Sequence, residues 1–504
     1  MSVATIYSRA QSGIEAPLVS VEVHLSNGLP RFSIVGLPET AVKESKDRVR
    51  AAIMSSNFDF PARRITVNLA PAELPKQGGR FDLPIALGLL VATKQLSAED
   101  IDDYEFLGEL GLNGELRRSV GILPAAYTCH LKGSKLITSV ENEEELIPIH
   151  HTKYFCANHL LDVCAHLNKT KLLVKNPKPQ QITVKDQYAS MDDVQGQASA
   201  KRALTIAAAG HHHVLMIGSP GSGKTMLASR FPSLLTVMSE REMLETCSLY
   251  SIANAQNNNR ILQTRPFRAP HHSVSSVGLA GGGSVPKPGE ISLAHNGVLF
   301  LDEFTEFARH TLEILREPIE TGKITISRAA AQVEFPAHFQ LIAAMNPCPA
   351  GCDMDSYGQC ECSSEQLQRY RNKISAPLLD RIDLQVNVPK LPSHLLFSQQ
   401  KNQTENWHEI ISRIHQAHKI QIDRQGKQNC FLAGKEIQKI CNLGNDLQQN
   451  FIGMVDKLSI SARGIHRILR VARTIADLEQ ADSITQSHLF EAMSYRQLDK
   501  FLKT

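Results

Sequence analysis

The 504-residue sequence predicts an α/β protein that ends in a helical segment, and three observations support this expectation. Over the first 165 residues, short strand-like runs alternate with longer helical stretches. From residue 191, a helical stretch is followed by an apolar strand-like run and by a glycine-rich loop that opens a second helix. Beyond about residue 390, polar helical patterns dominate. The expected fold is therefore two α/β domains followed by a helical domain.

The same patterns divide the chain into four stretches. Residues 1–165 hold the runs VSVEVHL, RFSIVGL and RITVNLA and are expected to form the first α/β domain. Residues 166–190 lose this periodicity and gain Lys, Pro and Gln, which predicts a linker. Residues 191–390 are expected to form the second α/β domain. Residues 391–504, which include TENWHEIISRIHQAHKIQI and SARGIHRILRVARTIADLEQA, are expected to form the helical one.

Composition excludes several classes of protein. Forty-two per cent of the residues are hydrophobic, which is enough to build the cores of about three domains. A formal charge of +3 excludes a strongly basic tail, so any contact with nucleic acid must come from local patches. The sequence shows neither a signal peptide nor an apolar run long enough for a bilayer, and its ten cysteines lack the pattern of a disulfide-stapled domain. We expect a cytoplasmic protein without a membrane partner.

A phosphate-binding loop occupies residues 218–225, which match the pattern G-x-x-x-x-G-K-[ST] without a mismatch. The apolar run before it and the helical stretch after it are the context that this motif requires. Glycines let backbone N–H groups turn toward phosphate oxygens, Lys224 is expected to reach the β- and γ-phosphates, and Thr225 is expected to ligate Mg²⁺. ATP and Mg²⁺ are therefore expected at Gly218, Ser219, Pro220, Gly221, Ser222, Gly223, Lys224 and Thr225.

Two further strand-like runs end in polar residues that suit the same site. The run GVLFL ends in Asp302, which is placed to hold the Mg²⁺ shell, and in Glu303, which is placed to polarise an attacking water. The run FQLIAAM ends in Asn346, whose amide can sense the γ-phosphate. Together with the phosphate-binding loop, these residues predict an ATP hydrolase.

Four cysteines lie close together in the sequence after Asn346. Cys348, Cys352, Cys360 and Cys362 follow the spacing C-x3-C-x7-C-x-C. Four thiolates this close can form a tetrahedral Zn²⁺ site, although the spacing is less regular than a pair of C-x2-C knuckles. Reduced free thiols are the alternative.

The motifs GSPGSGKT, GVLFLDEF, AAMNP and PLLDRIDL, in this order, resemble the magnesium-chelatase-like group of AAA+ ATPases. The longer segment FRAPHHSVSSVGLAGGGSVPKPGEISLAHNGVLFLDE is similar to the ComM/YifB family within that group, and the likeness extends over essentially the whole chain. The resemblance implies an AAA+ core with a helix-2 insert and a pre-sensor hairpin at 191–390, and a helical lid at 391–504. It also implies a sensor-1 role for Asn346, an arginine finger at Arg381 and a sensor-2 arginine at Arg463.

The N-terminal domain is similar to a different family. PAELPKQGGRFDLPIALGLL and LGELGLNGELRRSVGILPAAY resemble the peptidase domain of Lon, which has the ribosomal S5 domain 2-like fold. Lon-type proteolysis needs a serine that a lysine activates. Arg80 and Leu123 stand at those two positions. The resemblance therefore implies a non-catalytic domain for assembly or substrate handling.

The family resemblance also implies a function. It implies a ring-forming homo-oligomer, a hexamer by analogy, that acts as an ATP-dependent helicase and promotes branch migration during natural transformation. Lys287 in the insert and Arg328 in the pre-sensor hairpin are then expected to contact single-stranded and branched DNA without reading its sequence, whereas solvated loop charges are the alternative. Recombination proteins are candidate partners.

Two other functions stay open. One is a chelatase-type ATPase that remodels a protein partner, and the N-terminal domain argues against it. The other is an ATP-dependent unfoldase or protease-related factor, which the same domain favours and the missing Ser–Lys pair disfavours.

Overall fold

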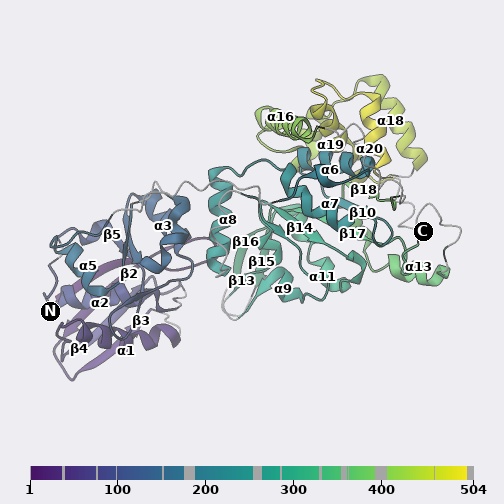
Figure 1. The fold of residues 1–504 in the computed structure, drawn as a ribbon. Helices are drawn as coiled ribbons and strands as arrows, with labels where there is room; N and C mark the ends of the chain where they lie inside the picture. Colours follow the sequence, from purple (N-terminus) through teal and green to yellow (C-terminus); the bar gives the residue numbers. More distant parts are fainter. Residues whose placement is uncertain are drawn as a thin grey trace. The chain divides into compact units, whose positions relative to one another are not determined.

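A computed structural model describes residues 2–36, 40–74, 76, 78–97, 99–149, 153–174, 188–253, 264–283, 286–327, 332–352, 360, 362–391, 406–458 and 460–496. The chain forms two compact units (Figure 1). Met1–Thr183 and Ser239–Gln263 make up the first unit, and Val184–Met238 and Thr264–Thr504 make up the second. A stretch of the first unit is therefore inserted into the sequence of the second.

The first unit is built on a seven-stranded sheet with the order β3-β4-β2-β1-β5-β8-β9. The strands are β1 (Ser2–Arg9), β2 (Leu18–Ser26), β3 (Arg31–Val35), β4 (Arg64–Ala70), β5 (Tyr104–Phe106), β8 (Lys135–Ser139) and β9 (Tyr154–Ala157). β2 pairs antiparallel with both β1 and β4, and the remaining neighbours pair parallel. Alternate residues of β2 and β4 are buried, so one face of this part of the sheet carries the core, whereas at β8 both faces are buried.

Helices pack against this sheet, with α2 and α3 in two separate hydrophobic clusters. Helix α2 (Asp82–Ala92) packs on β1 and β2 and is buried at nearly every position, which agrees with its almost wholly apolar sequence DLPIALGLLVA. The other helices of at least two turns before residue 183 are α1 (Thr40–Ser55), α3 (Ile122–Lys132) and α5 (Leu160–Leu167), among the described residues.

Helix α8 (Glu240–Ala253) belongs to the first unit although it follows residues of the second. Its Leu244 and Cys247 enter a hydrophobic cluster with Ile122 of α3. Ser251 Oγ donates a 2.9 Å hydrogen bond to Glu145 Oε2; burial raises the pKa of Glu145, and this bond opposes that effect. The sequence analysis did not separate this helix from the nucleotide-binding segment, because helical periodicity does not show which core a helix joins.

The second unit contains a five-stranded sheet with the order β11-β14-β17-β10-β18, in which all neighbouring strands are parallel. The strands are β10 (Val214–Ile217), β11 (Phe267–Arg268), β14 (Val298–Leu301), β17 (Gln340–Met345) and β18 (Leu384–Asn387). Every residue of β10, β14 and β17 is buried, as expected for parallel strands that are covered on both faces. The predicted α/β class with C-terminal helices is confirmed.

Short elements and a helical lid complete the second unit. Two small hairpins pair β12 (Gly281–Gly282) with β13 (Lys287–Pro288) and β15 (Lys323–Ser327) with β16 (Gln332–Pro336). The lid contains α16 (Trp407–Gln425), α17 (Gly434–Ile440), α18 (Asn445–Leu458), α19 (Ala462–Leu478) and α20 (Gln486–Ser494). Helix α6 (Ala198–Gly210) packs against α16 and α19, so the lid and the sheet share one hydrophobic core (Figure 1).

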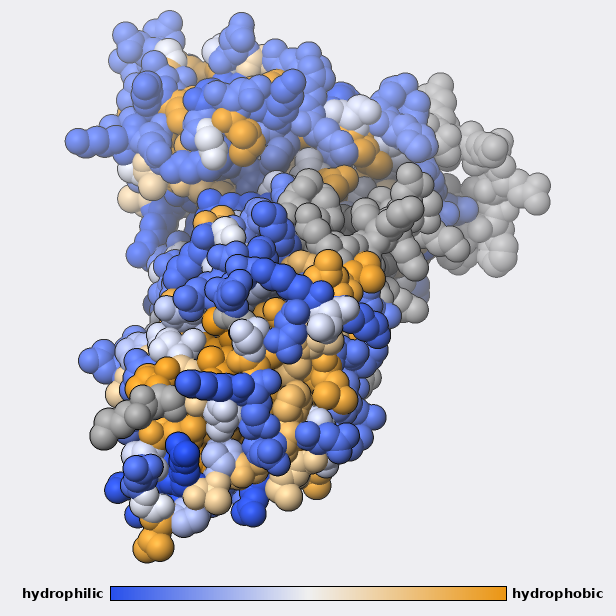
Figure 2. Space-filling model, turned by 90° about the vertical axis from the view of Figure 1, so that its left-hand side faces the viewer, coloured by the Kyte–Doolittle hydropathy of each residue, from blue (hydrophilic) through white to orange (hydrophobic). Residues whose placement is uncertain are grey.

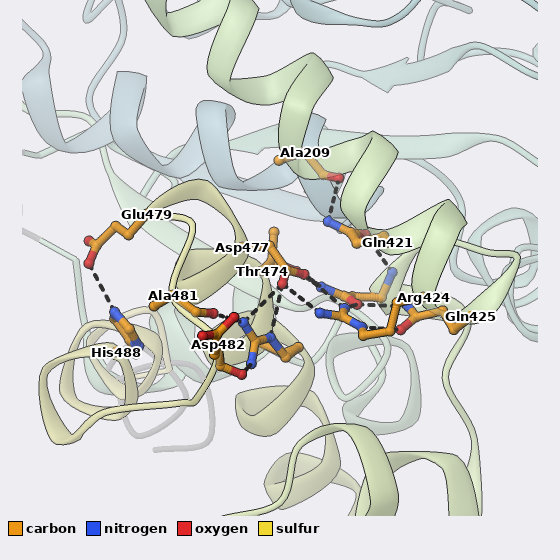
Figure 3. Close-up of polar contacts among 12 residues, drawn as sticks. Ala209, Gln421, Arg424, Gln425, Thr474, Asp477, Glu479, Ala481, Asp482 and His488 are labelled. Atoms are coloured by element: carbon orange, nitrogen blue, oxygen red, sulfur yellow. Dashed lines mark hydrogen bonds and ion pairs between the residues drawn. The ribbon is translucent and has the colours of Figure 1, made fainter.

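A buried polar network fixes the centre of the lid (Figure 3). The carboxylate of Asp477 on α19 is fully buried and accepts hydrogen bonds of 2.7 and 2.9 Å from Arg424 and of 3.0 Å from Arg473. Gln421 on α16 reaches the carbonyl oxygen of Ala209 in α6 at 3.1 Å. Such a network stabilises one packing arrangement only while all of its members are paired.

The surface is mixed in character. Figure 2 shows hydrophobic residues in patches among hydrophilic ones. Leu29 and Val3 are among the exposed large hydrophobic residues, at 89% and 66% exposure. In the described ranges, every helix is either too short or too polar to cross a membrane.

We predict that Asp477→Ala destabilises the second unit. The change leaves the buried guanidinium of Arg473 and the partly exposed guanidinium of Arg424 without their carboxylate, and breaking a buried ion pair in this way costs roughly 3–5 kcal/mol. Urea unfolding followed by fluorescence of Trp407 on α16 measures the loss. Asp482→Ala is the matched control, since Asp482 contacts Arg473 through its backbone carbonyl, which the substitution keeps. Equal unfolding midpoints for the parent and the Asp477 variant would contradict the assignment.

Candidate functional site

The phosphate-binding loop connects β10 to helix α7 (Lys224–Arg230). Gly221 and Gly223 have φ angles of 77° and 94°, a region in which a residue with a Cβ atom is strained. The glycines of the motif are therefore needed for the backbone conformation itself, and the loop has the strand-loop-helix context that the sequence predicted.

Lys224 lies across this loop. Its Nζ donates hydrogen bonds to the carbonyl oxygens of Gly218 and Ser219, at 2.8 and 3.0 Å, and lies 3.3 Å from Asn346 Oδ1. Burial lowers the pKa of Lys224, and the carboxylate of Asp302 works in the opposite direction. The ammonium group thus lies where a phosphate chain held by the loop would pass.

Thr225 and Asp302 form the second part of the site. Thr225 Oγ1 donates a 2.6 Å hydrogen bond to Asp302 Oδ2, and the other carboxylate oxygen accepts from the backbone N–H of Glu303 at 2.9 Å. A hydroxyl and a carboxylate oxygen at this separation are hard oxygen ligands of the kind that Mg²⁺ prefers next to nucleotide phosphates. The residues therefore fit the expected Mg²⁺ ion.

All these groups face one cavity of about 530 Å³. Its lining combines the loop, the start of α7 and the residues that follow β14 and β17: Pro220, Gly221, Gly223, Lys224, Thr225, Met226, Asp302, Glu303, Met345 and Asn346. The structure thus brings together the predicted residues from three separate segments of the chain.

Glu303 has a partner that the sequence analysis did not identify. Its backbone is left-handed, at φ 49°, and its Oε2 lies 2.9 Å from Nδ1 of His272. His272 follows β11, the neighbour of β14 in the sheet, so parallel pairing brings the two side chains to the same edge. The available sequence signal was the histidine pair that follows β11. Its role could not be inferred without the order of the strands in the sheet.

Arg381 is buried against its own chain. Its Nη2 forms a 2.6 Å ion pair with Glu320 Oε1, and its Nη1 donates to the carbonyl oxygen of Pro377 at 2.7 Å. Helix α12 (Arg316–Thr321) carries this glutamate. The sequence analysis did not identify Glu320 as the partner of Arg381, because the two residues lie far apart in the chain.

A second arginine fixes the backbone next to Arg381. Arg467 on α19 donates to the carbonyl oxygen of Arg381 at 2.5 Å and to Asp383 Oδ1 at 2.6 Å. Burial raises the pKa of Asp383, but the charge of Arg467 and the contact with His212 outweigh it, so the pKa lies well below its usual value. Arg463, the expected sensor, lies in the first turn of α19, is exposed and does not line the cavity.

Family comparisons cover nearly the whole chain. Residues 190–396 match a family described as magnesium chelatase, subunit ChlI, residues 21–142 match subunit ChlI of Mg-chelatase, and residues 404–496 match the C-terminal part of that subunit. The chain is 48% identical over 508 residues to competence protein ComM of Haemophilus influenzae, covering 100% of this chain and 99% of that protein. It belongs to the ComM/YifB family of magnesium-chelatase-like proteins. The predicted resemblance is confirmed.

Two further relatives match all or part of the chain. The chain is 48% identical over 502 residues to YifB of Salmonella typhimurium, covering 100% of this chain and 98% of that protein. DNA replication licensing factor Mcm6 of Anopheles gambiae is 24% identical over 226 residues, which cover 43% of this chain and 26% of that protein. A magnesium-chelatase-like AAA+ family with distant likeness to Mcm6 indicates an ATPase that uses ATP and Mg²⁺.

The two small hairpins of this chain lie next to each other. A Cβ atom at Gly281 in β12 would lie 2.7 Å from Cδ1 of Ile326 in β15. Lys287 in β13 is exposed. Arg328 lies outside the described residues. Its expected contact with DNA therefore stays a prediction.

The two positions that would hold the catalytic serine and lysine of a Lon-type peptidase are occupied by other residues. Arg80 donates hydrogen bonds to Gln11 Oε1 at 2.8 Å and to the carbonyl oxygen of Val120 at 2.6 Å, and burial lowers its pKa to about 10. Leu123 is buried in α3. Neither position can supply a nucleophile or a base. The match over 21–142 carries a chelatase description, so the Lon-like fold also stays a prediction.

We predict that Lys224→Ala lowers ATP hydrolysis by about 10²-fold or more, because it removes a positive charge aimed at the phosphates. Phosphate release at saturating ATP and Mg²⁺ measures the loss. Lys439→Ala changes an exposed lysine on α17 and should retain the parent rate. Parent-level hydrolysis by the Lys224 variant would mean that the cavity is not the hydrolytic site.

Proposed function

We propose that this chain is an ATP-dependent DNA motor that works as a ring, a hexamer by analogy, and drives branch migration of recombination intermediates during natural transformation. The observation that carries the proposal is the convergence of Lys224, Thr225, Asp302 and Asn346 on one cavity. It occurs in a chain that is 48% identical over its full length to a protein named for competence. The ten free thiols suit the cytoplasm, where we place this activity.

ATP hydrolysis follows from the groups that face the cavity. The loop N–H groups and Lys224 hold the phosphates, and Thr225 and Asp302 hold Mg²⁺, which neutralises charge that develops on the phosphate oxygens. Glu303 polarises the attacking water, which displaces ADP from the γ-phosphorus. His272 holds the carboxylate of Glu303 at the cavity edge, and Asn346 orients the water and the γ-phosphate.

Arg381 completes the site of a neighbouring subunit in this proposal. Its guanidinium would leave Glu320 and bind the γ-phosphate of ATP in the neighbouring subunit, since a phosphate dianion carries more negative charge than one carboxylate. Arg467 ties the backbone of Arg381 to α19, so a movement of the lid is transmitted to the finger. We assign Arg463 to phosphate sensing by the lid after such a movement.

DNA contact is assigned to the two hairpins. The contact between Gly281 and Ile326 joins the insert to the pre-sensor hairpin, and Lys287 exposes its charge on the joint surface. With Arg328, this lysine would bind phosphates of single-stranded and branched DNA independently of base sequence, with affinity that falls as salt rises. The likeness to Mcm6 supports a DNA-associated ring, and recombination proteins are the partners we expect.

The N-terminal unit is proposed to be a non-catalytic Lon-like domain that serves assembly or substrate handling. The side chains of Arg80 and Leu123 support the absence of proteolysis at those positions. The sequence analysis took this unit as an argument against a chelatase-type motor. That argument does not hold, because residues 21–142 match a family with a chelatase description. The chelatase-type alternative therefore has to be tested by comparing DNA with a protein as the substrate.

Strand displacement distinguishes these functions. We expect the parent protein with ATP and Mg²⁺ to dissociate labelled three-way and four-way DNA junctions of unrelated sequences, and Lys224→Ala to leave them intact. Gel analysis of the labelled strands measures the reaction. Failure on every junction, together with ATP hydrolysis that a folded protein substrate stimulates, would refute the DNA motor and favour a protein-remodelling ATPase.

We predict that Arg381→Ala binds ATP nearly as well as the parent but hydrolyses it about 10³-fold more slowly, the loss typical of an arginine finger. A fluorescent ATP analogue measures binding, and phosphate release measures hydrolysis. Arg413→Ala, which changes an exposed arginine of α16, is the control.

Mixing two inactive variants tests whether the finger acts between subunits. In a mixture of Lys224→Ala and Arg381→Ala, an intact loop of one variant meets an intact finger of the other, so hydrolysis should return in part. If each pure variant is inactive and the mixture stays inactive at concentrations that support ring formation, Arg381 does not act in trans.

A further inference from the structure

We propose that Cys348, Cys352, Cys360 and Cys362 bind one structural Zn²⁺ ion, and that this zinc knuckle braces the phosphate-binding loop. The sulfur atoms of Cys348, Cys352 and Cys360 all lie within 4.8 Å of one another. In a tetrahedral site with Zn–S distances of about 2.3 Å, neighbouring sulfurs lie about 3.8 Å apart. Three thiols therefore already lie near the spacing that the ion requires.

Cys362 supplies the fourth ligand. It follows Cys360 by two residues, which keeps it next to the cluster, although its sulfur is not one of the three that lie within 4.8 Å of one another. Four sulfur ligands close the coordination shell, which is typical of a structural zinc site and leaves no position for a reacting water.

A backbone hydrogen bond supports the same assignment. The N–H of Cys352 donates to Sγ of Cys348 at 3.2 Å. Amide groups that donate to sulfur partly offset the negative charge of a thiolate and orient it toward a metal, which is the usual role of groups around a metal site. Cys348 is buried, and the turn that returns the chain to it contains Gly351, with φ 71°.

This turn also contacts the nucleotide site. A Cβ atom at Gly351 would lie 2.7 Å from Cδ of Pro220, a residue that lines the cavity. Cys348 lies two residues after Asn346, and Tyr370 Oη donates to the carbonyl oxygen of Asn346 at 3.3 Å. A metal that fixes the turn thereby restrains both the phosphate-binding loop and Asn346. This bracing role rests on the proposed nucleotide site, whereas the metal site does not.

Metal analysis tests the site without ATP or DNA. Protein expressed with zinc and purified without chelators should contain about one zinc per chain by mass spectrometry. Cys360→Ser and Cys362→Ser should each lose most of it, whereas Cys156→Ser, in the first unit, should retain it. A parent protein with less than about a tenth of a zinc per chain, or variants with the parent's content, would overturn the proposal.

Cobalt substitution keeps the test independent of the folding of the variants. The unfolded, reduced parent refolded with Co²⁺ should show the visible absorption bands of tetrahedral cobalt with thiolate ligands, and one equivalent of Zn²⁺ should abolish them. A spectrum typical of octahedral cobalt would exclude the four-sulfur site.

Nucleotide binding tests the bracing role. Removing zinc with a strong chelator should weaken binding of a fluorescent ATP analogue about tenfold, the scale at which lost support around a site affects its function, and restoring zinc should reverse the change. Unchanged affinity in a metal-free, folded protein would refute the brace and leave the metal site intact. Absence of nucleotide binding in the zinc-loaded parent would instead refute the nucleotide site.

Discussion

Parallel pairing of β10, β17 and β14 is the constraint on which the site depends. In this register Ile217 lies opposite Met345, and Leu301 lies opposite Ala343. The residues that follow these strands therefore meet at one edge of the sheet, as in other open parallel sheets. The hydrogen bonds from Lys224 to Asn346 and from Thr225 to Asp302 follow from this register. A slip of a single strand would separate the lysine from the groups that hold the metal.

The start of the same central strand is joined to the lid. His212, two residues before β10, lies with its Nε2 2.8 Å from Thr474 Oγ1 on α19, and Asp383 accepts a hydrogen bond from the backbone N–H of His213 at 3.1 Å. Arg467 of α19 binds the same aspartate. Because these groups are buried, a lid movement that separates them would cost several kcal/mol. Buried contacts therefore couple the lid to the segment of Arg381 and to the central strand in this conformation, and a lid movement has to break some of them.

Sequence alone predicted the parts of the site that follow local rules. The phosphate-binding loop is contiguous, and Asp302, Glu303 and Asn346 each follow an apolar strand, so spacing and strand type were sufficient to place them. His272, Glu320 and Arg467 could not be predicted, because their partners depend on strand order and helix packing over long sequence distances. The core joined by α8 was missed for the same reason.

The insertion of α8 has a consequence for biosynthesis. The apolar face around Ile122 is completed only when Leu244 and Cys247 have left the ribosome, after β10 and α7 have already emerged. Translation therefore delivers only β10, one of the five strands of the parallel sheet, before the N-terminal unit can close its core. Domains that fold strictly one after another avoid such overlap. The apolar face around Ile122 therefore stays open during synthesis until α8 has emerged.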